Sequence, residues 1–189
     1  VGEALAACPD RVSALFVDEA RLEAYAALTA LVPQAACYAV PSHVLAAISQ
    51  VKTPQGVAAV CAMPPSPGPE EMGNRLILLE NVQDPGNVGT VLRTLDAAGF
   101  DGCILTPGCA DPFGPKALRA TMGSVFRVPV CCVGNTVETV QALNARGYAT
   151  LAAALDGENF YRRAPLPARL CVLIGNEGAG LTKQAQDAC

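Results

Sequence analysis

Two short stretches of this 189-residue chain carry polar side chains at spacings that suit ligand chemistry. The first, "ENVQDPGNVGTVLR" (80–93), runs from an apolar segment through a turn at Asp84-Pro85-Gly86 into a helix-like pattern with one arginine, Arg93. The second, "LIGNEGAGL" (173–181), ends an apolar segment in small residues around one carboxylate, Glu177. Amide, guanidinium and carboxylate groups supply hydrogen-bond donors and acceptors, so both stretches are candidate parts of one ligand site.

In the first stretch, Asn87 stands where a helix N-cap belongs, and we expect a helix over 88–98. A simple capped turn is the alternative interpretation of Asn87. Arg93 lies off the apolar face of this helix, and it also has two interpretations. It is either a solvated arginine paired with Asp96 three residues on, or a cation directed back over the turn toward an anionic ligand.

In the second stretch, the glycines follow the order G-x-x-G-x-G, the reverse of the dinucleotide-binding fingerprint, and the lysine-serine pair of a P-loop does not follow them. This order disfavours a nucleotide-dependent oxidoreductase. Gly175 predicts a close approach of backbone at the end of a strand. Glu177 either complements the dipole of a following helix from its first turn or reaches a bound group.

The elements that must position these residues alternate along the second part of the chain. Apolar segments at 75–82, 102–106, 126–133, 148–155 and 169–175 are predicted strands, separated by helix-like segments. This alternation predicts an α/β fold with a parallel sheet covered on both faces. Ligands bind at the carboxyl ends of such strands, which places the loops after Val82, Leu155 and Ile174 at the active edge.

The chain divides at a stretch rich in proline and glycine. Residues 1–63 alternate between strand-like and helix-like segments and predict a small α/β domain, and residues 74–189 form the larger domain. Between them, residues 64–73 contain four prolines and two glycines. We expect this stretch not to pack and to act as a semi-rigid linker.

Composition narrows the classes of function. A formal net charge of −4 gives no overall attraction to nucleic acid, so an RNA partner would need a local basic patch. No pair among the nine cysteines has the two-residue spacing of zinc knuckles, so we expect no metal and reduced thiols in a reducing cytoplasm. Prolines 33, 41 and 54 interrupt the apolar runs, and we expect no membrane span.

Taken together, the two stretches resemble the motifs of the SpoU/TrmH family of RNA ribose 2'-O-methyltransferases, in the SPOUT superfamily. The family's first motif is Asn-x-x-Asp-Pro-x-Asn-x-Gly with an arginine six residues after the last asparagine. Its second motif is Gly-x-Glu-x-x-Gly-Leu. "ADPFGPKALRATMGSVFRVPV" resembles the family's middle segment, and "VKTPQGVAAV" resembles the end of its N-terminal domain. The residues that match the two motifs are Asn81, Asp84, Pro85, Asn87, Gly89 and Arg93, then Gly175, Glu177, Gly180 and Leu181.

For the fold, the resemblance implies a parallel-sheet catalytic domain of the trefoil-knot type after a small α/β substrate-binding domain. Such knots are rare exceptions among protein folds. The family's third motif, which carries Ser-Leu-Asn and completes the knot, does not occur before Cys189. We therefore expect the knot-forming segment, and the first strand of the N-terminal domain, to lie outside the residues given.

For function, the resemblance implies transfer of a methyl group from S-adenosylmethionine to a ribose 2'-hydroxyl of RNA. It also implies a homodimer in the cytoplasm, and we expect ribosomal RNA rather than transfer RNA as the substrate. A transfer-RNA 2'-O-methyltransferase and a non-catalytic RNA-binding protein of the same fold are the alternatives. The implied residues are Asn87, Arg93 and Glu177 for catalysis, Ala153, Ile174 and Gly175 for the cofactor, and Lys116, Arg119 and Arg127 for RNA.

Overall fold

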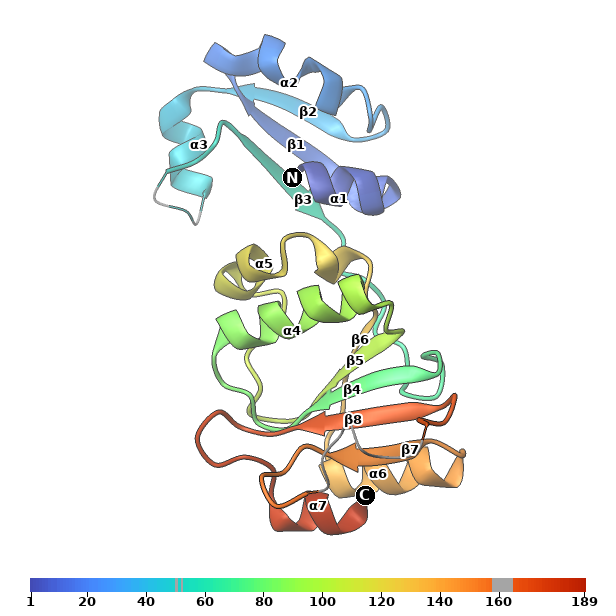
Figure 1. The fold of residues 1–189 in the computed structure, drawn as a ribbon. Helices are drawn as coiled ribbons and strands as arrows, with labels where there is room; N and C mark the ends of the chain where they lie inside the picture. Colours follow the sequence, from blue (N-terminus) through green and yellow to red (C-terminus); the bar gives the residue numbers. More distant parts are fainter. Residues whose placement is uncertain (50, 52, 158–164) are drawn as a thin grey trace. The chain divides into compact units, whose positions relative to one another are not determined.

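A computed structural model of the chain describes residues 1–189 except 50, 52 and 158–164. The chain divides into two compact units, Val1–Pro65 and Ser66–Cys189 (Figure 1). Each unit has its own sheet and its own buried core. None of the helices in the described ranges is long and apolar enough to cross a membrane.

The first unit is a small α/β domain. Its sheet has the order β2-β1-β3, in which β1 (Val12–Asp18) pairs in parallel with β2 (Ala36–Val40) and antiparallel with β3 (Val57–Cys61). Helices α1 (Gly2–Ala7), α2 (Leu22–Thr29) and α3 (Ser42–Ile48) accompany these strands, with 3₁₀ turns at Pro9–Arg11 and Glu19–Arg21. Leu5, Val12, Leu15 and Val32 form its core.

The second unit has a five-stranded sheet of order β6-β5-β4-β8-β7, in which every pairing is parallel, as predicted. Its strands are β4 (Arg75–Leu79), β5 (Gly102–Leu105), β6 (Val130–Cys132), β7 (Ala149–Ala152) and β8 (Leu170–Ile174). Its helices are α4 (Pro85–Ala98), α5 (Pro115–Thr121), α6 (Thr136–Ala145) and α7 (Lys183–Ala188), with a 3₁₀ turn at Ser124–Phe126.

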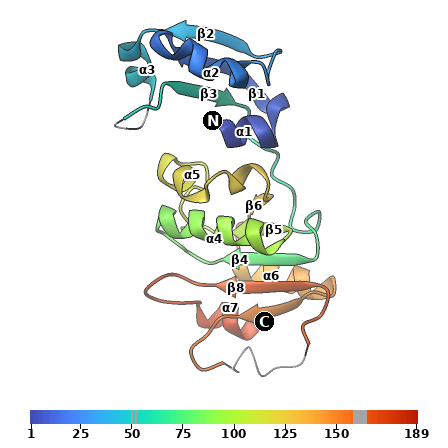
Figure 2. The same cartoon turned by 45° about the horizontal axis from the view of Figure 1, so that its top comes forward.

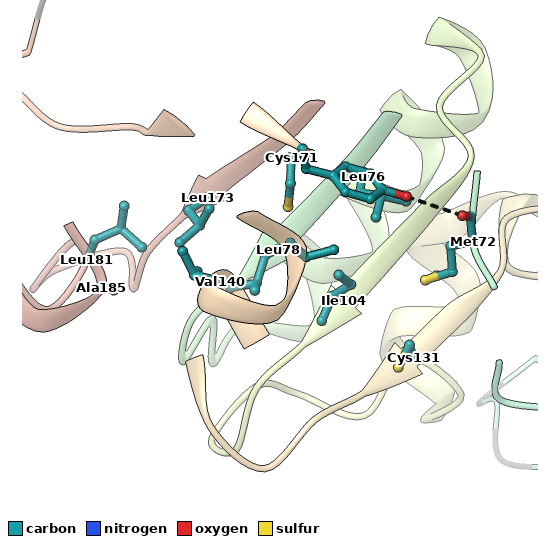
Figure 3. Packing of buried hydrophobic residues seen from close by; sticks show 12 residues of the cluster. Met72, Leu76, Leu78, Ile104, Cys131, Val140, Cys171, Leu173, Leu181 and Ala185 are labelled. Carbon is teal, nitrogen blue, oxygen red and sulfur yellow. Dashed lines mark hydrogen bonds between the residues drawn. The ribbon is translucent and has the colours of Figure 1, made fainter. Parts of the chain in front are cut away.

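This parallel sheet is buried on both faces, which confirms the expected layered arrangement (Figure 2). Alternate side chains of β4 point to opposite faces. Leu78 joins a cluster with Leu173 and with Val140 of α6 (Figure 3), and Leu79 joins a second cluster with Leu92 of α4. Burial of each such leucine stabilises the fold by about 1.5–3 kcal/mol.

The segment 64–73 packs more closely than predicted. Met72 is buried in the same core cluster as Leu78, and the Tyr148 hydroxyl donates a hydrogen bond of 2.6 Å to the carbonyl of Gly73. Ser66 also donates to the carbonyl of Val130. The expectation that this stretch cannot pack is therefore wrong from Ser66 onward, because one apolar side chain and a few hydrogen bonds suffice to attach it to the second unit.

The strand order defines where a ligand can enter. From β4 the chain adds β5 and β6 on one side, then crosses to β7 and returns to β8, next to β4 on the other side. Parallel sheets of this kind bind ligands in the crevice outside the carboxyl ends of the strands where the order reverses. Here that crevice lies beyond Leu79 and Ile174, where the two candidate stretches begin.

Candidate active site

The loop after β4 is held by Asp84, which is the N-cap of α4. Its Oδ1 accepts hydrogen bonds from the N–H groups of Gly86 (2.5 Å) and Asn87 (3.2 Å), and Pro85 occupies the first helical position. The helix therefore begins at residue 85, and the prediction of Asn87 as N-cap is wrong. Aspartate caps as well as asparagine, and a following proline favours the earlier start. Asn87 lies within the first turn, with its side-chain amide released from capping.

Glu177 binds this loop from the turn after β8, the strand that pairs with β4. Its Oε1 accepts hydrogen bonds from the Asn87 side-chain amide and the Asp84 N–H, both at 3.0 Å, and its Oε2 accepts from the Gln83 N–H at 3.3 Å. The Asn87 amide and these backbone donors lower the pKa of Glu177 to about 2. The carboxylate is thus ionised and saturated with donors at neutral pH, which suits a group that orders the loop.

The turn that carries Glu177 is compact. Asn176 and Gly180 exchange backbone hydrogen bonds of 3.1 and 2.9 Å, which folds residues 176–180 back over the end of β8. A methyl group on Gly175 would overlap the main chain of Gly180 and Leu181, so the predicted close backbone approach is confirmed. Since α7 begins only at Lys183, the interpretation of Glu177 as a first-turn residue of a helix is wrong.

Arg93 lies exposed on α4, and its guanidinium makes no hydrogen bond or ion pair with any residue in the described ranges. The expected partner, Asp96, is instead bound by Arg127, whose Nε and Nη2 donate to one carboxylate oxygen at 2.9 and 2.7 Å. This guanidinium lowers the pKa of Asp96. The pairing of Arg93 with Asp96 is therefore wrong, and the guanidinium of Arg93 is available to a ligand.

Helix α5 brings further cations to this side of the domain. Gly89 allows α4 and α5 to pack closely, because a methyl group there would lie 2.8 Å from the Ala117 carbonyl oxygen. The Lys116 Nζ lies 2.9 Å from Asp84 Oδ2 and so braces the N-cap of α4. Arg119, one turn later, is exposed, and its guanidinium has no hydrogen bond or ion pair with the part of the chain that the structure describes.

A cleft of about 990 Å³ opens at the carboxyl ends of β7 and β8. Ala153, Ile174 and Gly175 line it, together with Glu177 from the turn. Half of the residues that line it are alanines and glycines, and its size matches sites for small molecules. Glu177 therefore connects the cleft on one side with the Asn87 loop on the other.

Two residues that support the site were missed by sequence reasoning. Glu80, only 7% exposed, accepts hydrogen bonds from the N–H (2.8 Å) and hydroxyl (3.0 Å) of Thr182, and Thr182 in turn caps α7. Asn176 donates its side-chain amide to the carbonyl of Asn81 at 2.9 Å. A charged residue that ends an apolar run, as in "LILLE", could have indicated Glu80. Asn176 carries no such signal, because it differs from other polar loop residues only in preceding Glu177.

The nine cysteines are all free thiols. Burial raises the pKa of Cys171 to about 12, and it also raises the pKa of Cys103 well above its usual range. These two thiols act as small apolar core residues. Within the described ranges, no three histidine, cysteine or acidic side chains gather as a metal site would require.

Comparison with known families agrees with this architecture. Residues 74–189 match the SpoU rRNA Methylase family, and residues 1–67 match the domain described as RNA 2'-O ribose methyltransferase substrate binding. Among curated proteins, the chain is 39% identical over 148 residues to the 23S rRNA (guanosine(2553)-2'-O)-methyltransferase RlmP of Bacillus subtilis. That match covers 77% of this chain and 57% of the relative, so the chain spans little more than half of that protein's length.

Solved structures give the same result. A TrmH-family protein from Porphyromonas gingivalis superposes with a TM-score of 0.82 at 34% identity, over 100% of this chain and 73% of that one. An AdoMet-bound rRNA methyltransferase from Sinorhizobium meliloti superposes with a TM-score of 0.77 at 32% identity, over 96% and 70%. With its parallel sheet, its two loops and a family match over 74–189, the chain belongs to the SpoU rRNA Methylase family.

Proposed function

We propose that the full-length protein transfers a methyl group from S-adenosylmethionine to a ribose 2'-hydroxyl of RNA, with ribosomal RNA as the substrate. The observation that carries this proposal is the carboxylate of Glu177, which borders the cleft and binds the Asn87 loop beside it. Family membership supports it, as do the Bacillus subtilis relative named as a 23S rRNA 2'-O-methyltransferase and the AdoMet-bound neighbour.

The cleft fits the cofactor by its chemistry. Ala153 has only a methyl side chain and Gly175 has none, so a flat adenine ring can approach the main chain of this wall, and Ile174 adds apolar surface. We assign these three residues to hold S-adenosylmethionine. Once bound there, the cofactor would supply a methyl group that is already electrophilic, because it is carried on a sulfonium.

The protein must then position the ribose hydroxyl and stabilise the charge that develops on its oxygen. A guanidinium is a cation in proteins, so we assign Arg93 to bind an RNA phosphate and the developing negative charge rather than to remove a proton. Glu177 fixes the side-chain amide of Asn87 through its nitrogen, which leaves the amide oxygen to accept a hydrogen bond from the 2'-hydroxyl.

Three further cations would contact the RNA backbone. Arg119 is exposed, while Lys116 and Arg127 each hold a carboxylate on α4 or its N-cap. The overall charge of −4 means that such local cations, rather than the field of the whole molecule, must attract RNA. We further assign residues 1–63 to substrate binding, 64–73 to the connection and 74–189 to catalysis.

An assay of methyl transfer tests the assignment of the site. Full-length protein, radiolabelled S-adenosylmethionine and total RNA should give labelled ribosomal RNA, and Arg93→Ala should lower the rate by about 10²-fold or more, the scale of losing a charge-stabilising donor. Arg75→Ala is the matched control, because Arg75 begins β4 at the opposite edge of the sheet. Equal rates for the two variants would disprove the role of Arg93.

The alternatives predict other outcomes. A transfer-RNA methyltransferase would label the small RNAs, and a non-catalytic RNA-binding protein would bind RNA but show no heat of S-adenosylmethionine binding in calorimetry. The family resemblance also leads us to expect a homodimer in the cytoplasm, which sedimentation of the full-length protein and cell fractionation would test.

A further inference from the structure

Two side chains of the turn at 176–180 form hydrogen bonds with the loop after β4 in the described part of the chain. One is Glu177, and the other is Asn176. Its Nδ2 donates to the carbonyl oxygen of Asn81 at 2.9 Å and to Glu177 Oε2 at 3.3 Å. Its Oδ1 accepts from the N–H groups of Gly178 (2.9 Å) and Ala179 (3.0 Å). The amide thus uses both donors and both acceptor sites.

These partners fix the orientation of the amide. With nitrogen and oxygen exchanged, the amide nitrogen would face two N–H donors, and the oxygen would face a carbonyl and an ionised carboxylate. Only one orientation satisfies all four contacts. The half-buried position of Asn176 makes an unmade contact there more costly than one in open solvent.

The partner on the other side is held in an unusual backbone conformation. Asn81 has a φ of 54°, in the left-handed region that few residues other than glycine adopt. Its N–H donates to Thr106 at the end of β5, and its carbonyl receives the Asn176 amide. The loop that leads to Asn87 therefore starts from a backbone position that depends on contacts from both neighbouring strand ends.

We propose that Asn176 is a positioning residue for methyl transfer: its amide ties the RNA-side loop of Asn87 to the turn that borders the cofactor cleft, and it orients the Glu177 carboxylate between them. This inference rests on the function proposed above. Asn176 does not touch the reacting atoms. It acts through its hydrogen bonds to Asn81 and Glu177. These bonds link the turn that borders the cofactor cleft to the loop that places the ribose.

Asn176→Asp tests the inference, because it keeps the shape and the acceptor but replaces the donor with a second oxygen. At neutral pH this carboxylate would face the Asn81 carbonyl and the ionised Glu177, and kcat should fall by about tenfold to a hundredfold, the range for loss of a hydrogen bond to a charged group. Acidification protonates the new carboxyl, which the adjacent Glu177 charge favours, and restores a donor. The deficit relative to the native enzyme should therefore shrink as pH falls from about 8 to about 6.

Asn135→Asp is the matched control. The side chain of Asn135 caps α6 through its oxygen, which accepts from the Glu138 N–H. Aspartate preserves this cap, so the rate should match that of the native enzyme at every pH. Thermal melting of both variants establishes that they fold. An Asn176→Asp profile that runs parallel to that of the native enzyme, or an unchanged kcat, would overturn the positioning role.

Hydrogen exchange separates this inference from the proposed reaction. The N–H groups of Gln83 and Asp84 donate to Glu177, so peptides that cover residues 80–87 should exchange faster in Asn176→Asp than in the native protein, whatever the enzyme's activity. If these peptides exchange faster in Asn176→Asp but the native protein methylates no RNA, the proposed function would be overturned and the connection through Asn176 kept. Unchanged exchange in that loop would overturn the connection itself.

Discussion

Gly175→Ala should disable the cofactor cleft by moving the turn that forms its wall. The added methyl group would overlap main-chain atoms of Gly180 and Leu181, and backbone cannot rotate away as the end of a side chain can. The turn must retreat by about 1 Å to restore ordinary van der Waals contact. Overpacking of this kind costs about 1–3 kcal/mol of folding free energy.

The same displacement affects the site through Glu177. This residue lies in the moved turn and binds Asp84 and Asn87 at the start of α4. A misplacement of about 1 Å near reacting groups can lower a rate by about 10²-fold. We therefore expect Gly175→Ala to melt at a lower temperature, to bind S-adenosylmethionine at least about tenfold more weakly, and to lose most methyl transfer.

Gly178→Ala is the matched control for this experiment. A methyl group on Gly178 would meet nothing closer than the Asn176 Oδ1 atom at 3.7 Å, which is ordinary contact, although the residue lies in the same turn and lines the same cleft. Calorimetric titration and melting of both variants compare them directly. If Gly175→Ala binds the cofactor and melts like Gly178→Ala, then the close approach does not shape the cleft.

Two further predictions concern stability. Met122, the C-cap of α5, has a φ of 51° and is 65% exposed. Met122→Gly should therefore relieve backbone strain without losing packing, and raise the free energy of unfolding measured in urea by about 0.5–1 kcal/mol. An unchanged or lower free energy of unfolding would show that Met122 is not strained. The lowered pKa of Glu177 means that its contribution is fully present above its ordinary pKa of 4.5 and is lost as pH falls through about 2. The difference in melting temperature between the native protein and Glu177→Gln should thus shrink over that window, and a constant difference would show that the ionised form is not the stabilising one.

Much of the fold follows from the sequence. The alternation of apolar segments with helix-like segments between residues 75 and 189 predicted the parallel sheet, and the resulting shared edge placed the two motif loops together. Glu177 and Gly175 could be selected because a carboxylate and glycines at the end of an apolar strand are hard to explain by packing alone.

The parts that were missed depend on contacts between residues far apart in the chain. Asp84 and Asn87 are equally good caps, so local chemistry could not choose between them, whereas the structure shows Asn87 engaged by Glu177, 90 residues away. The ion pair of Asp96 with Arg127 in place of Arg93 arises in the same way, from the packing of α4 against the turn after α5. Met72 was hidden because proline and glycine around it predicted a stretch without packing.

The most direct measurement asks where the methyl group goes. Full-length protein would be incubated with S-adenosylmethionine and ribosomal RNA, and the RNA then hydrolysed with alkali and analysed by mass spectrometry. A methyl on the ribose 2'-oxygen blocks the attack that cleaves the adjacent linkage, so we expect one alkali-resistant dinucleotide that carries the added methyl group. With Arg93→Ala, this dinucleotide should form about 10²-fold more slowly. A methyl group found on a base, in RNA that alkali cleaves completely to mononucleotides, would contradict transfer to the ribose 2'-hydroxyl.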